Sequence, residues 1–125
     1  MLPKLIIFDV DGLMLDTEAR WQEAWDSVGK RYGVQDLGNT TFLKCVGRNG
    51  KEVEDIVKND LRQFAHPEKI LQEVREYGDE LLKERIDIKK GLMELLRFIQ
   101  SLSIPVAVAT ATDKDTIYQR LSRLQ

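Results

Sequence analysis

The chain has 125 residues, of which 42% are hydrophobic, 32% charged and 7% aromatic, and its formal net charge is -2. This composition is typical of a globular domain and excludes a disordered chain. The near-neutral charge argues against the basic field that non-specific nucleic-acid binding needs. The apolar run at residues 5–8 is too short for a signal sequence or a membrane span. The single cysteine, Cys45, permits no internal disulfide, so we expect a buried thiol in a cytoplasmic protein.

Hydrophobic periodicity predicts a strand followed by several helices. Residues 4–10 contain four consecutive apolar residues, which indicates a strand buried on both faces, as in a parallel sheet. Residues 35–50 are rich in Gly and Asn and are expected to form mostly loop. On either side of this loop, apolar residues recur at helical spacing in three stretches, over residues 21–32, 53–64 and 70–82.

The last third of the chain returns to a strand pattern. Gly91 precedes an expected helix over residues 92–102, and residues 104–109 form a second short apolar run that predicts a strand. Thr112 and Asp113 are candidate N-caps of a last helix. Its apolar face is expected to carry Ile117, Leu121 and Leu124.

The order of these elements predicts an α/β fold with an inserted helical module. Removing residues 16–85 leaves a strand–helix–strand–helix unit, which is typical of a parallel-sheet core. We therefore assign residues 1–15 and 86–125 to the core and residues 16–85 to the insertion.

The first chemical motif is Asp9-Val10-Asp11-Gly12, where the first predicted strand ends. Active groups of parallel sheets gather beyond the carboxyl ends of the strands. Two carboxylates this close repel each other unless a cation or a proton lies between them, and Mg²⁺ prefers oxygen ligands. One carboxylate could attack phosphorus while the other transfers protons, and Gly12 permits a tight turn beside a phosphate. Asp and Gly are also common at any exit from a strand, so the motif alone leaves both interpretations open.

The second motif lies at the end of the second predicted strand. Thr110 ends the apolar run and Ala111 follows it. If the two strands are parallel, Thr110 and Asp9 emerge at the same edge of the sheet. A hydroxyl followed by free N–H groups at a helix start favours an anion site. The alternative is that these residues only pack and cap the helix.

Together the two motifs resemble a known family. Residues 5–18 read Leu-Ile-Ile-Phe-Asp-Val-Asp-Gly-Leu-Met-Leu-Asp-Thr-Glu, which is similar to the first motif of the haloacid dehalogenase-like (HAD) hydrolases. Residues 106–110 resemble their second motif, a hydrophobic strand that ends in Thr or Ser. Residues 88–91 resemble the turn that re-enters the core, although Lys90 stands where Pro is frequent.

This resemblance implies a Rossmann-like core with a helical cap of the C1 type, and a Mg²⁺-dependent phosphatase. Asp9 is then the nucleophile and a metal ligand. Asp11 is the general acid and base and offers its carbonyl oxygen to Mg²⁺. Thr110 and the N–H of Ala111 hold the phosphoryl group of a small phosphorylated metabolite, with Gly12 beside it.

In the insertion, Arg48 lies in a loop that could face the substrate and bind an anionic group, or it could be a solvated surface residue. Trp21 and Trp25 share one helical stripe and are expected to pack in the core, although Trp21 could also face the site. His66 is expected to be a loop residue. A β-phosphoglucomutase would resemble this sequence too, but such relatives carry His where Trp21 stands.

Two further family motifs have no match before Gln125. The third supplies a Lys, and the fourth supplies acidic residues that complete the Mg²⁺ site. We therefore expect an N-terminal fragment, weak or inactive alone, completed by a C-terminal segment or a second chain. The alternatives are a sugar-phosphate mutase and a non-catalytic interaction fragment.

Overall fold

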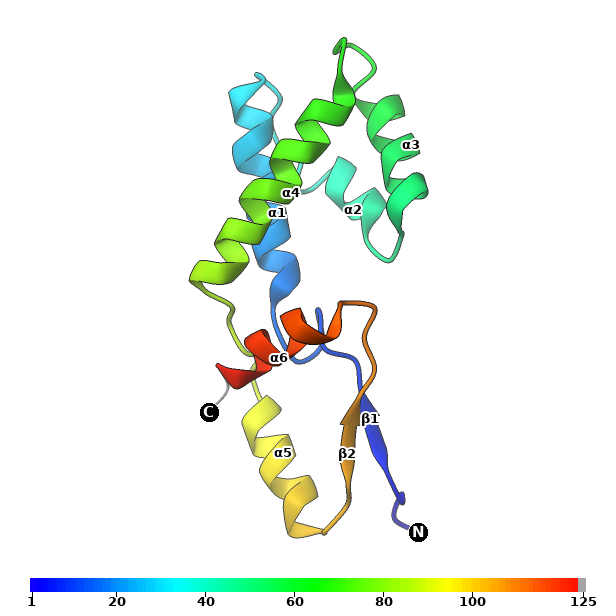
Figure 1. The fold of residues 1–125 in the computed structure, drawn as a ribbon, viewed down its shortest axis with the longest axis vertical. Helices are drawn as coiled ribbons and strands as arrows, with labels where there is room; N and C mark the ends of the chain where they lie inside the picture. Colours follow the sequence, from blue (N-terminus) through cyan, green and yellow to red (C-terminus); the bar gives the residue numbers. More distant parts are fainter. Residues whose placement is uncertain (124–125) are drawn as a thin grey trace. The chain divides into compact units, whose positions relative to one another are not determined.

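The computed structural model describes residues 1–123, and Leu124 of the expected last apolar face lies outside them. The order of strands and helices confirms the α/β class. The elements are β1 (Ile6–Phe8), α1 (Thr17–Arg31), α2 (Thr41–Cys45), α3 (Gly50–Asp60), α4 (Pro67–Glu84), α5 (Leu92–Ser101), β2 (Val106–Val108) and α6 (Lys114–Ser122) (Figure 1). Of these helices, none combines the length and the apolar character that crossing a membrane requires.

The chain divides into two compact units. Met1–Thr17 and the segment from Ile86 onward form one, here called the α/β unit. Glu18–Arg85 form the other, here called the helical unit.

The α/β unit is built on two parallel strands. β1 pairs with β2 so that Ile6 lies opposite Val106 and Phe8 opposite Val108 (Figure 1). The N–H of Ala109 donates to the carbonyl oxygen of Phe8 (2.8 Å), which extends the pairing past the ends of both strands. The predicted parallel sheet is thus present, with two strands among the described residues.

The prediction of a strand buried on both faces was wrong. Phe8 is 8% exposed, whereas its neighbour Ile7 is 60% exposed because successive side chains point to opposite faces of a sheet. Side chains of α5 and α6 join Phe8 in one buried cluster and cover a single face. The cluster comprises Phe8, Val10, Met14, Leu15, Leu92, Ile99 and Ile117.

Backbone hydrogen bonds join the segment before the inserted helices to the segment after them. The N–H of Asp16 donates to the carbonyl oxygen of Asp87 (2.8 Å), and the N–H of Lys89 donates to that of Met14 (2.9 Å). The ammonium of Lys89 also lies 3.3 Å from Oδ1 of Asp16. The two segments that connect the α/β unit to the helical unit are therefore hydrogen-bonded to each other through their backbones.

The helical unit forms its own hydrophobic core. α4 begins with Pro67 at its first turn, where a missing N–H costs nothing. α1 ends before Gly33, whose φ of 74° is a left-handed conformation that glycine adopts readily. The buried members come from all four helices and their connections: Ala24, Trp25, Val28, Leu37, Cys45, Val57, Leu61, Ile70, Leu71, Val74 and Leu81.

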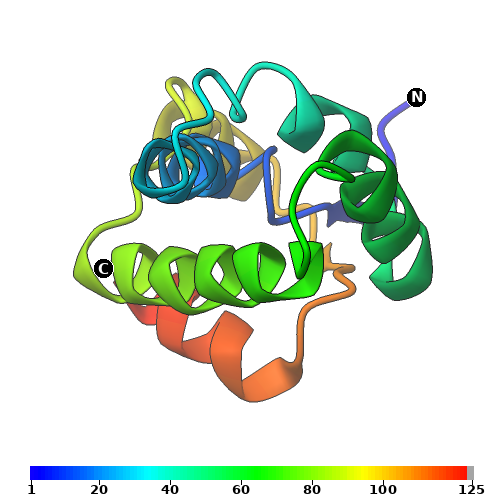
Figure 2. The same cartoon turned by 90° about the horizontal axis from the view of Figure 1, so that it is seen from above.

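α1 and α4 approach each other closely where they cross (Figures 1 and 2). A Cβ atom at Gly78 of α4 would overlap the ring of Trp21 on α1. Trp25, one turn further along α1, is 3% exposed. The expected core packing of Trp25 is confirmed, and Trp21 packs on Gly78, a contact that the sequence pattern did not reveal.

Candidate active site

Asp9 directly follows β1 and stands at the head of a tight loop. Its Oδ1 accepts a hydrogen bond from the N–H of Val10 (2.8 Å), and Val10 is fully buried. The carbonyl oxygen of Val10 accepts the N–H groups of Met14 (2.9 Å) and Leu15 (3.0 Å), so the loop folds back on itself. Gly12 has a φ of 81°, which a residue with a side chain rarely adopts. The loop thereby keeps the exposed carboxylate of Asp9 at the edge of the sheet.

Thr110 lies at the same edge. Phe8 pairs in register with Val108, so Asp9 comes one residue after its strand and Thr110 two residues after the other. The carboxyl ends of parallel strands share one edge, which places the two residues as the parallel-sheet interpretation requires. Oγ1 of Thr110 accepts the N–H of Thr112 (3.1 Å).

The turn after Thr110 leads through the exposed Ala111 into α6. Asp113 is the N-cap, since its Oδ1 accepts the N–H of Thr116 (2.9 Å). This hydrogen bond holds the pKa of Asp113 below its ordinary value. Of the two predicted N-cap residues, Asp113 therefore has that role and Thr112 does not.

Thr112 instead binds Asp11. Its hydroxyl donates to Oδ2 of Asp11 (2.6 Å), while Nη1 of Arg120 lies 3.2 Å from Oδ1. The side chain of Asp11 is 30% exposed and that of Arg120 14% exposed. The structure thus joins the first motif to the second through contacts across more than a hundred residues.

Sequence reasoning did not select Thr112 or Arg120 as site residues. Thr112 carried a signal, because it stood beside the second motif as a helix cap. No sequence signal marked Arg120, because charged residues are common in helices and its partner Asp11 lies 109 positions earlier in the chain. Lys114, next to the same turn, lies over the ring of Tyr118 with its ammonium 5.6 Å from the ring centroid.

Arg48 belongs to the helical unit, whereas Asp11, Thr112 and Arg120 belong to the α/β unit. Arg48 is exposed, its Nε donates to the carbonyl oxygen of Lys44 (3.2 Å), and its Nη1 lies 3.7 Å from Glu52. A role for Arg48 toward a substrate stays a prediction. His66 is exposed before α4 and pairs with Glu68, as expected of a loop residue.

Cys45 is buried in the core of the helical unit, as expected. Burial raises the pKa of its thiol. A raised pKa is typical of a cysteine that packs in apolar surroundings.

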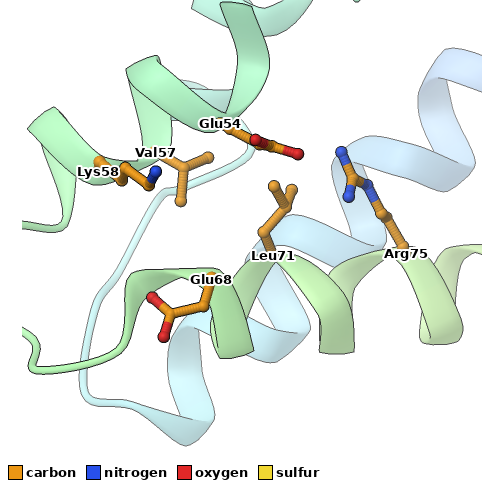
Figure 3. A pocket seen from close by; sticks show the side chains of 6 residues that line it. All are labelled: Glu54, Val57, Lys58, Glu68, Leu71 and Arg75. Carbon is orange, nitrogen blue, oxygen red and sulfur yellow. The ribbon is translucent and has the colours of Figure 1, made fainter. Parts of the chain in front are cut away.

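The structure has one pocket beside the second motif and another away from the predicted site residues. One, of about 440 Å³, adjoins the second motif and is lined by residues that include Thr110, Thr112 and Lys114. Another, of about 380 Å³, lies between α3 and α4, where the carboxylate of Glu54 faces the guanidinium of Arg75 above Val57 and Leu71 (Figure 3). None of the predicted site residues lines this second pocket.

The acidic groups of the first motif supply only some of the ligands of a metal site. Asp9 offers an oxygen ligand of the kind that Mg²⁺ prefers, but both oxygens of Asp11 accept hydrogen bonds. Within residues 1–123, no three side chains of His, Cys, Asp or Glu gather where they could hold a metal ion. The described residues therefore supply part of a Mg²⁺ ligand set and not a complete one.

A match to a family model defines the class of protein. The chain belongs to the haloacid dehalogenase-like hydrolases, since the family model of that description matches residues 6–125. This finding confirms the resemblance drawn from the two motifs.

Particular relatives are phosphatases. The chain is 33% identical over 125 residues to a phosphorylated carbohydrates phosphatase of Thermotoga maritima, covering 95% of this chain and 55% of the relative. It is 28% identical over 126 residues to the validoxylamine A 7'-phosphate phosphatase of Streptomyces hygroscopicus subsp. limoneus, covering 97% and 56%. The chain therefore spans little more than half the length of these curated relatives.

A solved structure supports the fold. The HAD family hydrolase from Deinococcus radiodurans R1, crystallised with bound phosphate and sodium, matches with a TM-score of 0.77 at 18% identity. The match covers 95% of this chain and 51% of that one.

Proposed function

We propose that the α/β unit carries part of the active site of a phosphomonoester hydrolase that works through an aspartyl-phosphate on Asp9. The observation that carries this proposal is the register of β1 and β2, which brings the carboxylate of Asp9 and the hydroxyl of Thr110 to one edge of the sheet. Membership of a hydrolase family and two phosphatase relatives support it.

In the first step, an oxygen of Asp9 attacks phosphorus and the bond from phosphorus to the leaving oxygen breaks. The protonated carboxyl group of Asp11 gives its proton to that oxygen, and an alcohol leaves. In the second step, the Asp11 carboxylate takes a proton from water, and the water oxygen attacks phosphorus. The bond to Asp9 then breaks, and inorganic phosphate is released with both aspartates restored.

The second motif holds the phosphoryl group in this proposal. Thr110 accepts the N–H of Thr112, which leaves its hydroxyl hydrogen free to donate to a phosphate oxygen. In this proposal the N–H of Ala111, two residues before the N-cap of α6, is a second donor to the same anion. Gly12 makes the left-handed turn after Asp9, and in this proposal the phosphate binds beside that turn.

Mg²⁺ belongs to this proposal as a cofactor with Asp9 and the carbonyl oxygen of Asp11 among its ligands. Because the described residues do not form a complete ligand set, none of the steps above is assigned to the ion. The two relatives point to a phosphorylated carbohydrate as the first class of small substrate to test.

The test is turnover of an aryl phosphate and of a panel of sugar phosphates with Mg²⁺. The enzyme is the natural polypeptide, including whatever its reading frame encodes after Gln125. We expect phosphate release that Asp9→Asn abolishes and that Asp55→Asn, at an exposed aspartate of α3, leaves unchanged. Activity that survives Asp9→Asn contradicts the proposal, and isomerisation of a sugar phosphate without phosphate release would establish the mutase alternative instead.

A further inference from the structure

Asp11 is held in one orientation by two residues of the second half of the α/β unit. Each of its carboxylate oxygens has its own donor, the hydroxyl of Thr112 at 2.6 Å and Nη1 of Arg120 at 3.2 Å. A carboxylate that accepts at both oxygens cannot rotate freely, because rotation breaks two hydrogen bonds, one of them to a charged group.

The helix that carries Arg120 is itself fixed. Ile117 of α6 is 5% exposed and packs in the same cluster as Val10, the residue between the two aspartates of the motif. Arg120 follows Ile117 by three positions and therefore lies on the same face of the helix. Its guanidinium is mostly shielded from water, since the side chain is 14% exposed. The ion pair is thus part of a packed contact rather than a flexible surface pair.

We propose that Arg120 is a positioning residue that, together with Thr112, sets the orientation of the Asp11 carboxylate for proton transfer. This inference rests on the proposed function, because it assigns Arg120 a role through Asp11. Thr112 also donates its N–H to Thr110, so one residue ties the proton-transfer group to the phosphate-binding hydroxyl.

Loss of Arg120 leaves Asp11 with one neutral donor. Proton transfer occurs only in the transition state, so a misoriented Asp11 lowers kcat without weakening substrate binding. We expect Arg120→Ala to lower kcat roughly 10- to 100-fold, with KM nearly unchanged, since small misplacements of catalytic groups have effects of that size. Arg120→Lys, which keeps the charge, should recover part of the lost kcat. Arg97→Ala, at an exposed arginine of α5, is the matched control and should keep the kcat of the unaltered protein.

A second measurement does not depend on activity. The guanidinium of Arg120 should give an NMR resonance that is shifted from those of solvated arginines, and Asp11→Asn should remove that shift. Thermal unfolding of each variant checks that the protein as a whole stays folded.

The two arms separate the failure of this inference from the failure of the proposed function. An unchanged kcat in Arg120→Ala, in a protein that Asp9→Asn inactivates, overturns the role of Arg120 alone. An Arg120 resonance that ignores Asp11→Asn overturns the contact itself, even if the protein releases no phosphate. Equal losses of kcat and of folded protein in Arg120→Ala, without recovery in Arg120→Lys, would show a structural role only.

Discussion

Apolar side chains of α4 in the helical unit and of the two strands in the α/β unit differ in how much of their surface is exposed. In the helical unit, Ile70 on α4 is 1% exposed and belongs to a core that its own helices complete. In the α/β unit, Ile7 on β1 is 60% exposed, and Val106 and Val108 on β2 are 42% and 40% exposed. Isoleucine is thus buried on α4 and exposed on β1, while Ile99 and Ile117 on the helices of the α/β unit are buried, at 3% and 5% exposure. Burial depends on how many layers cover an element, and the face of β1 that carries Ile7 lacks, among the described residues, the cover that the inner face of α4 has.

Ile70→Ala should give the largest effect on stability. It removes a fully buried side chain, which typically costs about 2–5 kcal/mol because a cavity remains. Urea denaturation followed by tryptophan fluorescence measures the loss, since both tryptophans, Trp21 and Trp25, lie in the helical unit. A loss below about 1 kcal/mol would mean that the helical core is loosely packed, contrary to the comparison.

Gly78→Ala tests the contact between α1 and α4. A methyl group there would overlap the Trp21 ring, and overpacking of this kind costs about 1–3 kcal/mol despite the better helix propensity of alanine. Gly50→Ala, at a helical glycine with nothing close to an added Cβ, is the matched control. If both variants were equally stable, the close approach of the two helices would be refuted.

Asp60 makes the helical unit sensitive to acid. Partial burial opposes its ionisation, but hydrogen bonds from Lys44 (2.8 and 2.9 Å) and Thr41 (3.0 Å) outweigh burial and lower its pKa. A lowered pKa in the folded state stabilises the fold above the ordinary aspartate pKa of about 3.9. That stabilisation is lost as the pH falls from there through the lowered pKa. The fluorescence-detected free energy of unfolding should therefore fall less steeply with acid in Asp60→Asn than in the unaltered chain, and identical slopes would contradict this role.

Ile7→Ala should have the smallest effect. Its side chain already faces solvent, so the expected change in the free energy of unfolding is within about 0.5 kcal/mol. Hydrogen exchange of the Met14 and Leu15 amides, which bind the carbonyl oxygen of Val10, reports on the α/β unit. A loss similar to that of Ile70→Ala would show that this face of β1 is covered in solution, and the comparison between the units would fail.

The sequence predicted what local patterns and topology control. Strand-like and helical periods marked the elements, and the parallel pairing of β1 and β2 agrees with the prediction that Asp9 and Thr110 follow strands that end at one edge of the sheet. The exposure of Ile7 was not predictable in this way, because a run of four apolar residues does not determine whether one or both faces of the strand are covered by other elements. Gly78 and Arg120 were missed for a shared reason, since their partners Trp21 and Asp11 lie far away along the chain.

The proposed hydrolysis depends on the transfer of a phosphoryl group to Asp9. The natural polypeptide, mixed with an aryl or sugar phosphate and Mg²⁺, quenched in acid and digested, should yield by mass spectrometry a peptide with one phosphoryl group on Asp9. The modification should be absent in Asp9→Asn and present in Asp55→Asn. Phosphate release by the unaltered protein, with no phosphoryl group on Asp9 and with the same rate in Asp9→Asn, would contradict the account.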